Sequence, residues 1–358
     1  MTGRAAGVLW VAPPPADGIS ARTRLLGVPL ARRVAVAAER AGFERILFAA
    51  APGLAESLAG TRAEVVEGGP PAPPPEGPAR LVVLPFGVLP TSAWLRGRVD
   101  GTDGPRSSDA PASRAGLIEI ASGKDLPSAE RRLLQSLIKD TEGFFSRHIN
   151  RRVSLAVTRR LAGTRMTPNA MTAISVAIGL AGAAFFLSGE ARFQFAGALL
   201  FLLHSILDGC DGELARLKFQ ESRLGGVLDF WGDNVVHCAV FACLAVGWSR
   251  DTADPRPLIA GALAVAGTLL SAGFVARHAL GHAAGGPQFT SVTRRAQTRT
   301  SRIADMLARR DFIYLVVLLS AFGKARWFLA LAAAGAPIFF FTLLAIEAAG
   351  RRLGRDLP

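Results

Sequence analysis

Four aspartates combine residue type and spacing in a way that suits metal-assisted chemistry. They are Asp208, Asp211, Asp229 and Asp233. Side chains three or four residues apart lie on one face of an α-helix, so the four acids form two pairs of carboxylates. The residues between Arg216 and Gly225 are few enough to form a short turn. Such a turn would bring the two acidic faces together.

Carboxylates in apolar surroundings are costly to place, at about 2.5–3.5 kcal/mol each in the middle of a bilayer, and they repel one another. Divalent cations would remove both penalties. Gly212 and Gly225 would let a bulky ligand approach the backbone, and Ala215 is almost as small. Arg216 can bind a phosphate through two donors. The alternative, aspartates that only cap helices at an interface, requires no fixed spacing, so we favour a metal and phosphate site.

This segment resembles the signature of the CDP-alcohol phosphatidyltransferase family, D-x2-D-G-x2-A-R-x8-G-x3-D-x3-D. The matching residues are Asp208, Asp211, Gly212, Ala215, Arg216, Gly225, Asp229 and Asp233. Upstream, Thr167-Pro168-Asn169 is similar to the TPN element before the family's first membrane helix. The resemblance covers the chain from about Phe144 to its C-terminus.

The resemblance implies metal-dependent transfer of a substituted phosphate group from a CDP-alcohol to an acceptor hydroxyl, with release of CMP. The implied metal residues are Asp208, Asp211, Asp229 and Asp233, with two Mg²⁺ or Mn²⁺ ions held chiefly by the first three. Asp233 would be the general base. The implied CDP-alcohol contacts are Gly212, Ala215, Arg216, Gly225, Thr167 and Asn169. A polyol or polyol phosphate would be the acceptor.

Three arginines in a later basic loop, Arg294, Arg295 and Arg299, are candidates for the acceptor phosphate. Attraction to lipid headgroups explains them equally well. His204 and His237 lie one helical turn before and after the aspartates. Packing or hydrogen bonding is favoured for both over metal ligation, because hard cations take oxygen ligands.

The elements that must position this site are apolar helices. The composition is 50% hydrophobic and 19% charged, with a mean hydropathy of +0.31, and this balance favours a membrane protein. A span needs about 20 mostly apolar residues. Six are predicted, at 170–188, 193–207, 234–248, 257–276, 312–323 and 327–346. The second and third must extend into the acidic segment, and the fifth must borrow flanking residues.

Charge and cysteine usage exclude several classes of protein. The net charge is +13, and most of the excess flanks the apolar runs, so we expect membrane lipids and no nucleic acid as partners. Basic residues from 277 to 310 and after 350 place both termini in the cytoplasm of an inner or cell membrane protein. Three cysteines in apolar stretches exclude a disulfide scaffold. We also expect a homodimer.

Residues 1–121 are predicted to form a small α/β, Rossmann-like cytoplasmic domain before the six-helix polytopic membrane domain at 167–358. Strands are expected at 8–11, 46–48, 65–66 and 81–84, with a helix over 29–41. Two amphipathic helices are expected within 122–166. The second, over 151–161, has an apolar stripe of Val153, Val157 and Leu161 among arginines. It suits a membrane interface, and packing on the soluble domain is the alternative.

The N-terminal domain resembles a nucleotidyltransferase through Gly27-Val28-Pro29-Leu30. Such a domain precedes the membrane domain in bifunctional inositol-phosphate cytidylyltransferase/di-inositol-phosphate-phosphate synthases. Here Gly18 is all that remains of the glycine-rich turn, and Pro85-Phe86-Gly87 replaces a metal-binding aspartate. The domain is therefore predicted to be degenerate and inactive. The alternative for the whole chain is an inactive membrane scaffold whose soluble domain binds a nucleotide or partner.

Overall fold

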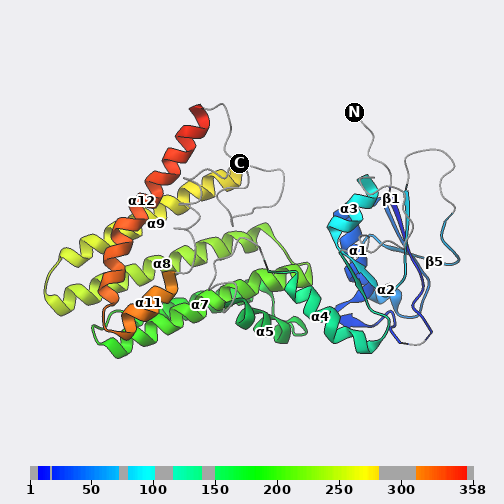
Figure 1. Cartoon of the computed structure of the whole chain (residues 1–358), viewed down its shortest axis with the longest axis horizontal. Coiled ribbons are helices and arrows are strands. Elements are labelled where there is room, and N and C mark those ends of the chain that lie inside the picture. Colours follow the sequence, from blue (N-terminus) through cyan, green and yellow to red (C-terminus); the bar gives the residue numbers. More distant parts are fainter. Residues whose placement is uncertain are drawn as a thin grey trace. The chain divides into compact units, whose positions relative to one another are not determined.

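The computed structural model describes residues 7–16, 18–71, 80–100, 116–138, 150–281 and 312–352. They divide into two compact units (Figure 1). The first contains the chain up to Leu137 with two short later segments, 162–164 and 217–219, and the second contains the remainder.

A four-stranded parallel sheet forms the centre of the first unit. Its strands are β1 (Gly7–Val11), β4 (Arg45–Ala49), β5 (Glu64–Val66) and β6 (Arg80–Leu84), in the order β5-β4-β1-β6. Leu9 in β1 pairs with Ile46 on one side and Val82 on the other. The four predicted strands are confirmed, and they form the parallel sheet expected of a Rossmann-like domain. Continuous apolar runs of this length are typical of strands covered on both faces of a sheet.

Helix α1 (Leu30–Ala41) packs on this sheet and ends where Gly42 adopts a left-handed φ of 92°. Arg33 of α1 is buried and donates to the carbonyl of Leu25 at 2.8 and 3.2 Å. Burial lowers the pKa of Arg33 to about 10. The remaining elements are the pair β2 (Arg24–Leu25) and β3 (Val28–Pro29), α2 (Leu54–Ser57), the pair β7 (Val88–Pro90) and β8 (Leu117–Glu119), and α3 (Ser92–Asp100). Strands of two or three residues are too short to show an alternating pattern, so sequence analysis missed both of these two-stranded sheets.

The first unit extends beyond the expected boundary at residue 121. A 3₁₀ turn (Gly123–Asp125) leads into α4 (Leu126–Gln135), and Ser122 and Asp125 form a capping box at its start. Ala129 of α4 is 1% exposed and belongs to the same hydrophobic core as Ile120. The first of the two predicted juxtamembrane helices therefore packs into the α/β unit, because its apolar stripe completes that core.

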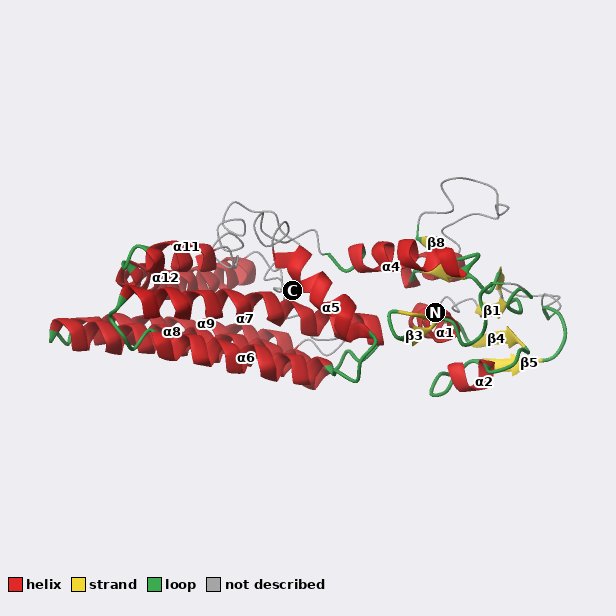
Figure 2. Cartoon of the chain, turned by 90° about the horizontal axis from the view of Figure 1, so that it is seen from below, coloured by secondary structure: helices red, strands yellow, loops and turns green. Residues whose placement is uncertain are grey.

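The second unit is a set of helices that run side by side (Figure 2). They are α5 (Arg151–Ala162), α6 (Pro168–Phe185), α7 (Ala191–Lys218), α8 (Arg223–Thr252), α9 (Arg256–Gly281), α11 (Phe312–Ala321) and α12 (Ala325–Arg352). Within the described residues, α6, α7, α8, α9 and α12 are long and apolar enough to cross a membrane, whereas α11 has ten residues. Five of the six predicted spans thus reach the required length, and the described part of the fifth, which begins at Phe312, does not.

Close helix contacts depend on small residues. A Cβ at Gly179 of α6 would lie 2.6 Å from Val236 of α8 and 2.9 Å from His204 of α7. A Cβ at Gly182 would lie 2.9 Å from the carbonyl oxygen of Gly197. Glycine at these positions lets the three helix backbones approach closely, as expected for helix packing in membranes. This approach brings the acidic parts of α7 and α8 beside α6.

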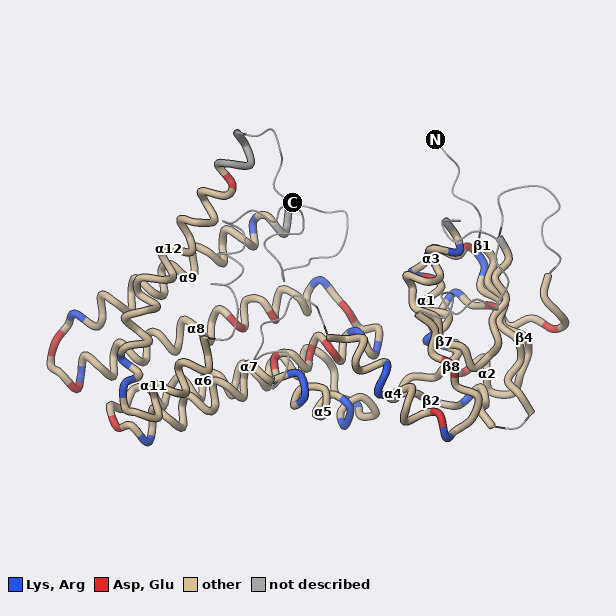
Figure 3. The backbone as a smooth tube through the Cα atoms, in the orientation of Figure 1, with Lys and Arg blue, Asp and Glu red and all other residues tan. Residues whose placement is uncertain are grey.

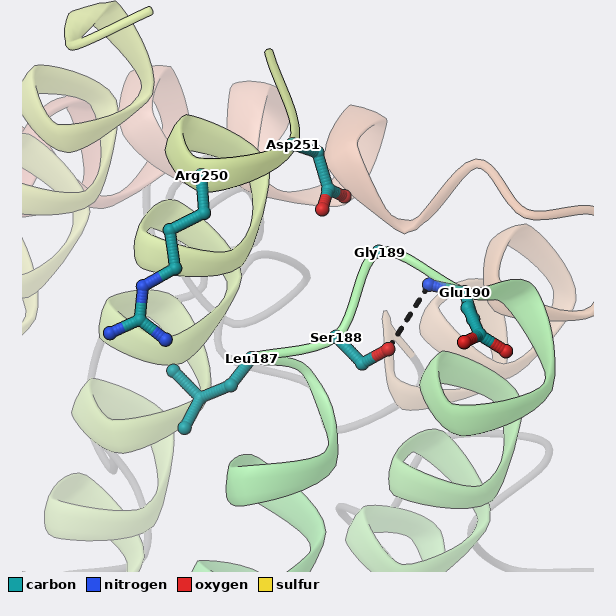
Figure 4. Close-up of a pocket in the computed structure, with 6 residues that line it drawn as sticks. All are labelled: Leu187, Ser188, Gly189, Glu190, Arg250 and Asp251. Atoms are coloured by element: carbon teal, nitrogen blue, oxygen red, sulfur yellow. Dashed lines mark hydrogen bonds between the residues drawn. The ribbon is translucent and has the colours of Figure 1, made fainter. Parts of the chain in front are cut away.

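The α6–α7 turn lies at the opposite end of α7 from the aspartates. There, Gly189 packs so closely on the Asp251 carboxylate that a Cβ would overlap it, and a shallow pocket is lined by Leu187, Ser188, Gly189, Glu190, Arg250 and Asp251 (Figure 4). Glu190 and Asp208 are 18 residues apart, which is about 27 Å along a helix. This pocket is therefore separate from the candidate site.

We expect the two ends of α8 to be on opposite sides of a membrane. Lys, Arg, Asp and Glu positions are frequent at the turns between the long helices (Figure 3), and α8 has 30 residues, about 45 Å. A cysteine replacing exposed Thr252 should react with an impermeant maleimide from outside intact cells. A cysteine replacing exposed Gln220 should react only after the cytoplasmic face is opened. Wild-type protein is the control for labelling of the native cysteines Cys210, Cys238 and Cys243. The reverse labelling pattern would contradict the prediction that both termini are cytoplasmic.

Candidate active site

Three carboxylates from two helices converge. Asp208 and Asp211 of α7 and Asp229 of α8 each offer an oxygen, and these oxygens lie within 4.8 Å of one another. Asp208 is 3% exposed, Asp211 is 6% exposed and Asp229 is half-buried. Because the acids within each helix share a face, the turn between α7 and α8 brings the two faces together. The described structure thus supports the predicted meeting of the acidic faces for three of the four aspartates.

The turn forms where α7 ends, in a left-handed cap. Phe219 has a φ of 59°, and the backbone N–H of Gln220 donates to the carbonyl of Ala215 at 2.9 Å. This is the hydrogen bond of a Schellman motif. Helix α8 then begins after Ser222, whose hydroxyl accepts from the backbone N–H of Gly225 at 3.0 Å.

Asp233 lies one turn along α8 from Asp229 and is not among the three converging carboxylates. Its Oδ1 is 3.3 Å from Nε2 of His204, whose side chain is 1% exposed. The Nδ1 of His204 is 2.9 Å from the carbonyl oxygen of Ser175. Nε2 lies close to Asp233 but makes no hydrogen bond to it. A carbonyl can only accept, so Nδ1 carries the proton and donates to Ser175. His204 therefore has the hydrogen-bonding role that sequence analysis favoured over metal ligation.

A threonine that sequence analysis missed also contacts the site. The hydroxyl of Thr172, on α6, donates to Oδ2 of Asp211, and the backbone N–H of Gly212 donates to Oδ1 of the same carboxylate. Thr172 is 5% exposed. It lies one helical turn after Pro168, and this spacing from the TPN element was the only signal available in the sequence. Both oxygens of Asp211 are thus held in place before any ligand binds.

The upstream element lies beside the acidic motif. Thr167 caps α6 by accepting from the backbone N–H of Ala170 at 3.2 Å. A Cβ at Gly225 would lie 3.0 Å from Oδ1 of Asn169 and 3.0 Å from Oγ of Ser222. Asn169 and Gly225, which are far apart in the sequence, are therefore neighbours. Any side chain at position 225 would press on Asn169.

Two further motif residues, Gly212 and Arg216, are adjacent on α7. A Cβ at Gly212 would lie 3.3 Å from Nη1 of Arg216, so the guanidinium extends along the helix past the glycine. The candidate acceptor residues Arg294, Arg295 and Arg299 lie outside the described residues.

A comparison with protein families identifies this part of the chain. Residues 165–298 match the family model described as CDP-alcohol phosphatidyltransferase. This part of the chain is therefore similar to a CDP-alcohol phosphatidyltransferase domain. The match begins just before the TPN element and includes all four aspartates, so the matched residues contain the site described above.

Curated relatives of this part of the chain carry several different names. The "Bifunctional IPC transferase and DIPP synthase" of Thermococcus kodakarensis is 38% identical over 131 residues, which is 36% of this chain and 29% of the relative. The Rubrobacter xylanophilus protein of the same name is 34% identical over 154 residues, 42% of this chain and 34% of the relative. "Phosphatidylinositol phosphate synthase" of Mycobacterium bovis is 31% identical over 121 residues, 34% of this chain and 54% of the relative. The chain thus spans about a third of the length of the bifunctional relatives.

Solved structures give more distant similarities. The Mycobacterium tuberculosis phosphatidylinositol phosphate synthase with CDP-DAG bound is 23% identical, with a TM-score of 0.38, and 54% of this chain and 94% of that one are covered. A structure of the same synthase in complex with manganese and citrate is 26% identical, with a TM-score of 0.37, and 53% and 88% are covered.

Proposed function

We propose that this protein transfers a substituted phosphate group from a CDP-alcohol to an acceptor hydroxyl. The acceptor oxygen bonds to the phosphorus that bears the alcohol, the bond from that phosphorus to CMP breaks, and the acceptor proton passes to Asp233. The observation that carries this proposal is the convergence of Asp208, Asp211 and Asp229 in the domain that matches the family. In this proposal the donor is a CDP-alcohol, and the acceptor is a polyol or a polyol phosphate.

The converging carboxylates suit divalent cations. Three acidic side chains, two of them buried, would repel one another strongly without counterions, and their oxygens are the donors that Mg²⁺ and Mn²⁺ prefer. Two such ions, when bound, would neutralise the diphosphate and the charge that develops on departing CMP. Thr172 and the N–H of Gly212 fix the orientation of Asp211 for this purpose.

Asp233 is proposed as the general base because its environment differs from that of the other aspartates. Its carboxylate lies beside His204, which is itself held by Ser175, about one helical turn from the metal carboxylates. Asn169 at the start of α6 lies beside Gly225 at the start of α8, and Arg216 lies on α7. We assign these residues, with Gly212, Ala215 and Thr167, to the binding of the CDP-alcohol.

The function is tested by an assay of CMP release. Purified protein in lipid nanodiscs would be supplied with CDP-inositol or CDP-diacylglycerol, each with inositol phosphate or glycerol phosphate, in the presence of Mg²⁺ or Mn²⁺. Release of CMP that requires both the acceptor and the metal supports the proposal and names the substrates. No release with any pair, from folded protein, would favour the membrane scaffold instead.

The chain also presents large apolar side chains outward, including Leu263 on α9 and Leu331 and Phe341 on α12. We propose that membrane lipids and a second copy of the chain cover these faces. A covalent cross-link between identical chains in the native membrane would support the dimer. Full activity of a monomer in nanodiscs would show that the dimer is not required for the reaction.

The first unit has no described carboxylate in the position that nucleotidyl transfer needs, and we propose that it is inactive. In an open parallel sheet, ligands bind at the carboxyl ends of the strands where the strand order reverses, here between β1 and β6. The loops after these strands direct Ile19 and Phe86 into the hydrophobic core, where each is 3% exposed. Gly87 packs so tightly on the backbone of Ile120 that a Cβ would overlap its carbonyl oxygen.

We therefore expect no pyrophosphate release from CTP and inositol phosphate by the full-length protein. Among the described residues, the ends of β1 and β6 present apolar contacts and no carboxylate that could hold magnesium beside a triphosphate. A bifunctional relative assayed in parallel is the positive control. CTP-dependent pyrophosphate release above the background of a mock purification would refute the expectation and make the chain bifunctional.

A further inference from the structure

A third acidic residue of α7, outside the converging carboxylates, is completely buried. Glu213 is 0% exposed and accepts three hydrogen bonds from helix α5. The donors are Nη1 of Arg151 at 2.7 Å, Oγ of Ser154 at 2.7 Å and Oγ1 of Thr158 at 2.6 Å. A buried carboxylate is stable only when its charge is paired and its oxygens are satisfied, so this contact joins α5 and α7 strongly.

The contact is specific in its geometry. Ser154 is 1% exposed and Thr158 is 0% exposed, so the buried face of α5 includes its hydroxyls, whereas Val153 is 43% exposed. A Cβ at Gly209 of α7 would lie 2.9 Å from Nη1 of Arg151, so glycine at this position admits the guanidinium. The apolar stripe predicted from the sequence is thus not the whole contact surface of α5, because a polar row beside it binds Glu213.

Helix α5 is also held at the residue just before its start. The side chain of Asn150, immediately before α5, accepts from the hydroxyl of Tyr314 on α11 at 2.5 Å, and Asn150 is 7% exposed. Tyr314 is the only tyrosine in the sequence. Helix α5 therefore has fixed contacts with both α11 and α7, and it can resist movement of α7 rather than follow it.

Glu213 and Asp211 are two residues apart and so project from nearly opposite sides of α7. Asp211 is held from one side by Thr172 of α6, and Glu213 is held from the other by α5. Contacts on opposite sides of a helix restrict its rotation about its own axis. A rotation of about 10° would move a side-chain oxygen at the helix surface by about 1 Å, given a helix radius of about 5–6 Å.

We infer that α5 is the element that positions the metal carboxylates of α7, and that Glu213, Arg151, Ser154 and Thr158 are positioning residues for this site. The inference rests on the proposed function, since it concerns the same three carboxylates. A displacement of about 1 Å can cost about 10²-fold in a catalysed rate. Loss of the Glu213 contacts should therefore weaken metal binding in protein that is still folded.

The test is direct titration of the full-length protein with Mn²⁺, with unbound Mn²⁺ measured by electron paramagnetic resonance. Glu213→Gln should raise the Mn²⁺ dissociation constant by about tenfold or more, and Ser154→Ala, which removes one donor, should raise it less. Arg151→Lys keeps a charge and should be milder than Arg151→Met. The matched control is Arg152→Met, which changes an exposed arginine next to Arg151 and should bind Mn²⁺ like wild type.

Thermal unfolding and gel filtration measure the folded fraction of each variant. All Mn²⁺ dissociation constants are calculated for the folded protein. Wild-type dissociation constants in folded Glu213→Gln and Ser154→Ala would overturn the inference. If Glu213→Gln does not fold, the Mn²⁺ dissociation constant of Ser154→Ala is compared with that of Arg152→Met. Equal constants for these two variants would overturn the inference. Wild-type protein that binds Mn²⁺ but releases no CMP would contradict the proposed function. The Mn²⁺ dissociation constants of the variants would then still support or overturn the inference about α5.

Discussion

Replacing Asp233 with asparagine is expected to lower CMP release by about 10²–10⁴-fold while CDP-alcohol binding changes little. Proton transfer by a positioned base contributes a factor of this size, and an amide cannot accept the proton. Donor binding should persist because Asp208, Asp211 and Asp229 form the converging group without Asp233. The measurements are the steady-state rate of CMP release and the affinity for a nonhydrolysable CDP-alcohol, both in nanodiscs.

Glu190→Gln is a suitable control for the Asp233 variant, because it changes an exposed carboxylate at the far end of α7. Its rate should equal that of wild type. Unchanged CMP release in Asp233→Asn would show that another group accepts the proton. Loss of donor affinity in step with the rate would instead place Asp233 among the residues that bind the donor or its metal ions.

Replacing Asp211 with asparagine is expected to weaken metal and CDP-alcohol binding together, each by at least about tenfold. One of three converging charges is lost, and the diphosphate is held through the ions that those charges attract. Asp208→Asn should behave in the same way. Mn²⁺ titration and donor binding at saturating Mn²⁺ are the two measurements.

Thr172→Val provides a graded comparison for Asp211→Asn. It removes the hydroxyl that orients Asp211 but keeps the carboxylate and the side-chain volume, so its effect on Mn²⁺ affinity should be smaller. Donor affinity that survives in Asp211→Asn despite lost Mn²⁺ binding would contradict a diphosphate held through metal ions.

Much of the candidate site follows from spacing along the chain. Residues three or four apart share a helix face whatever the tertiary structure, so the pairing of Asp208 with Asp211 could be predicted. The apolar periods outside the acidic segment likewise predicted the long helices, and the β-branched runs predicted the parallel sheet. What spacing does not reveal is which face of one helix meets which face of another.

The missed residues illustrate this limit. Thr172, Glu213 and Ser154 are ordinary polar residues in the sequence, and the same pattern would suit side chains exposed to water. They are buried where helices approach closely, with Gly232 of α8 packed near Thr172 and Gly209 of α7 packed near Ser154. Once buried, each polar group needs a partner, and the partner is on a different helix.

The amino-acid sequence by itself determined the helices, the parallel sheet and the two acidic pairs, because these depend on local periodicity and on residue type. The tertiary structure alone decided that Asp211 is held by α6, that Glu213 is held by α5, and that Asp233 faces His204. It also decided that Phe86 joins the core of the first unit. The physical reason is that a buried polar or apolar side chain is stabilised by residues distant in the chain, and only the packed helices and sheet bring those residues together.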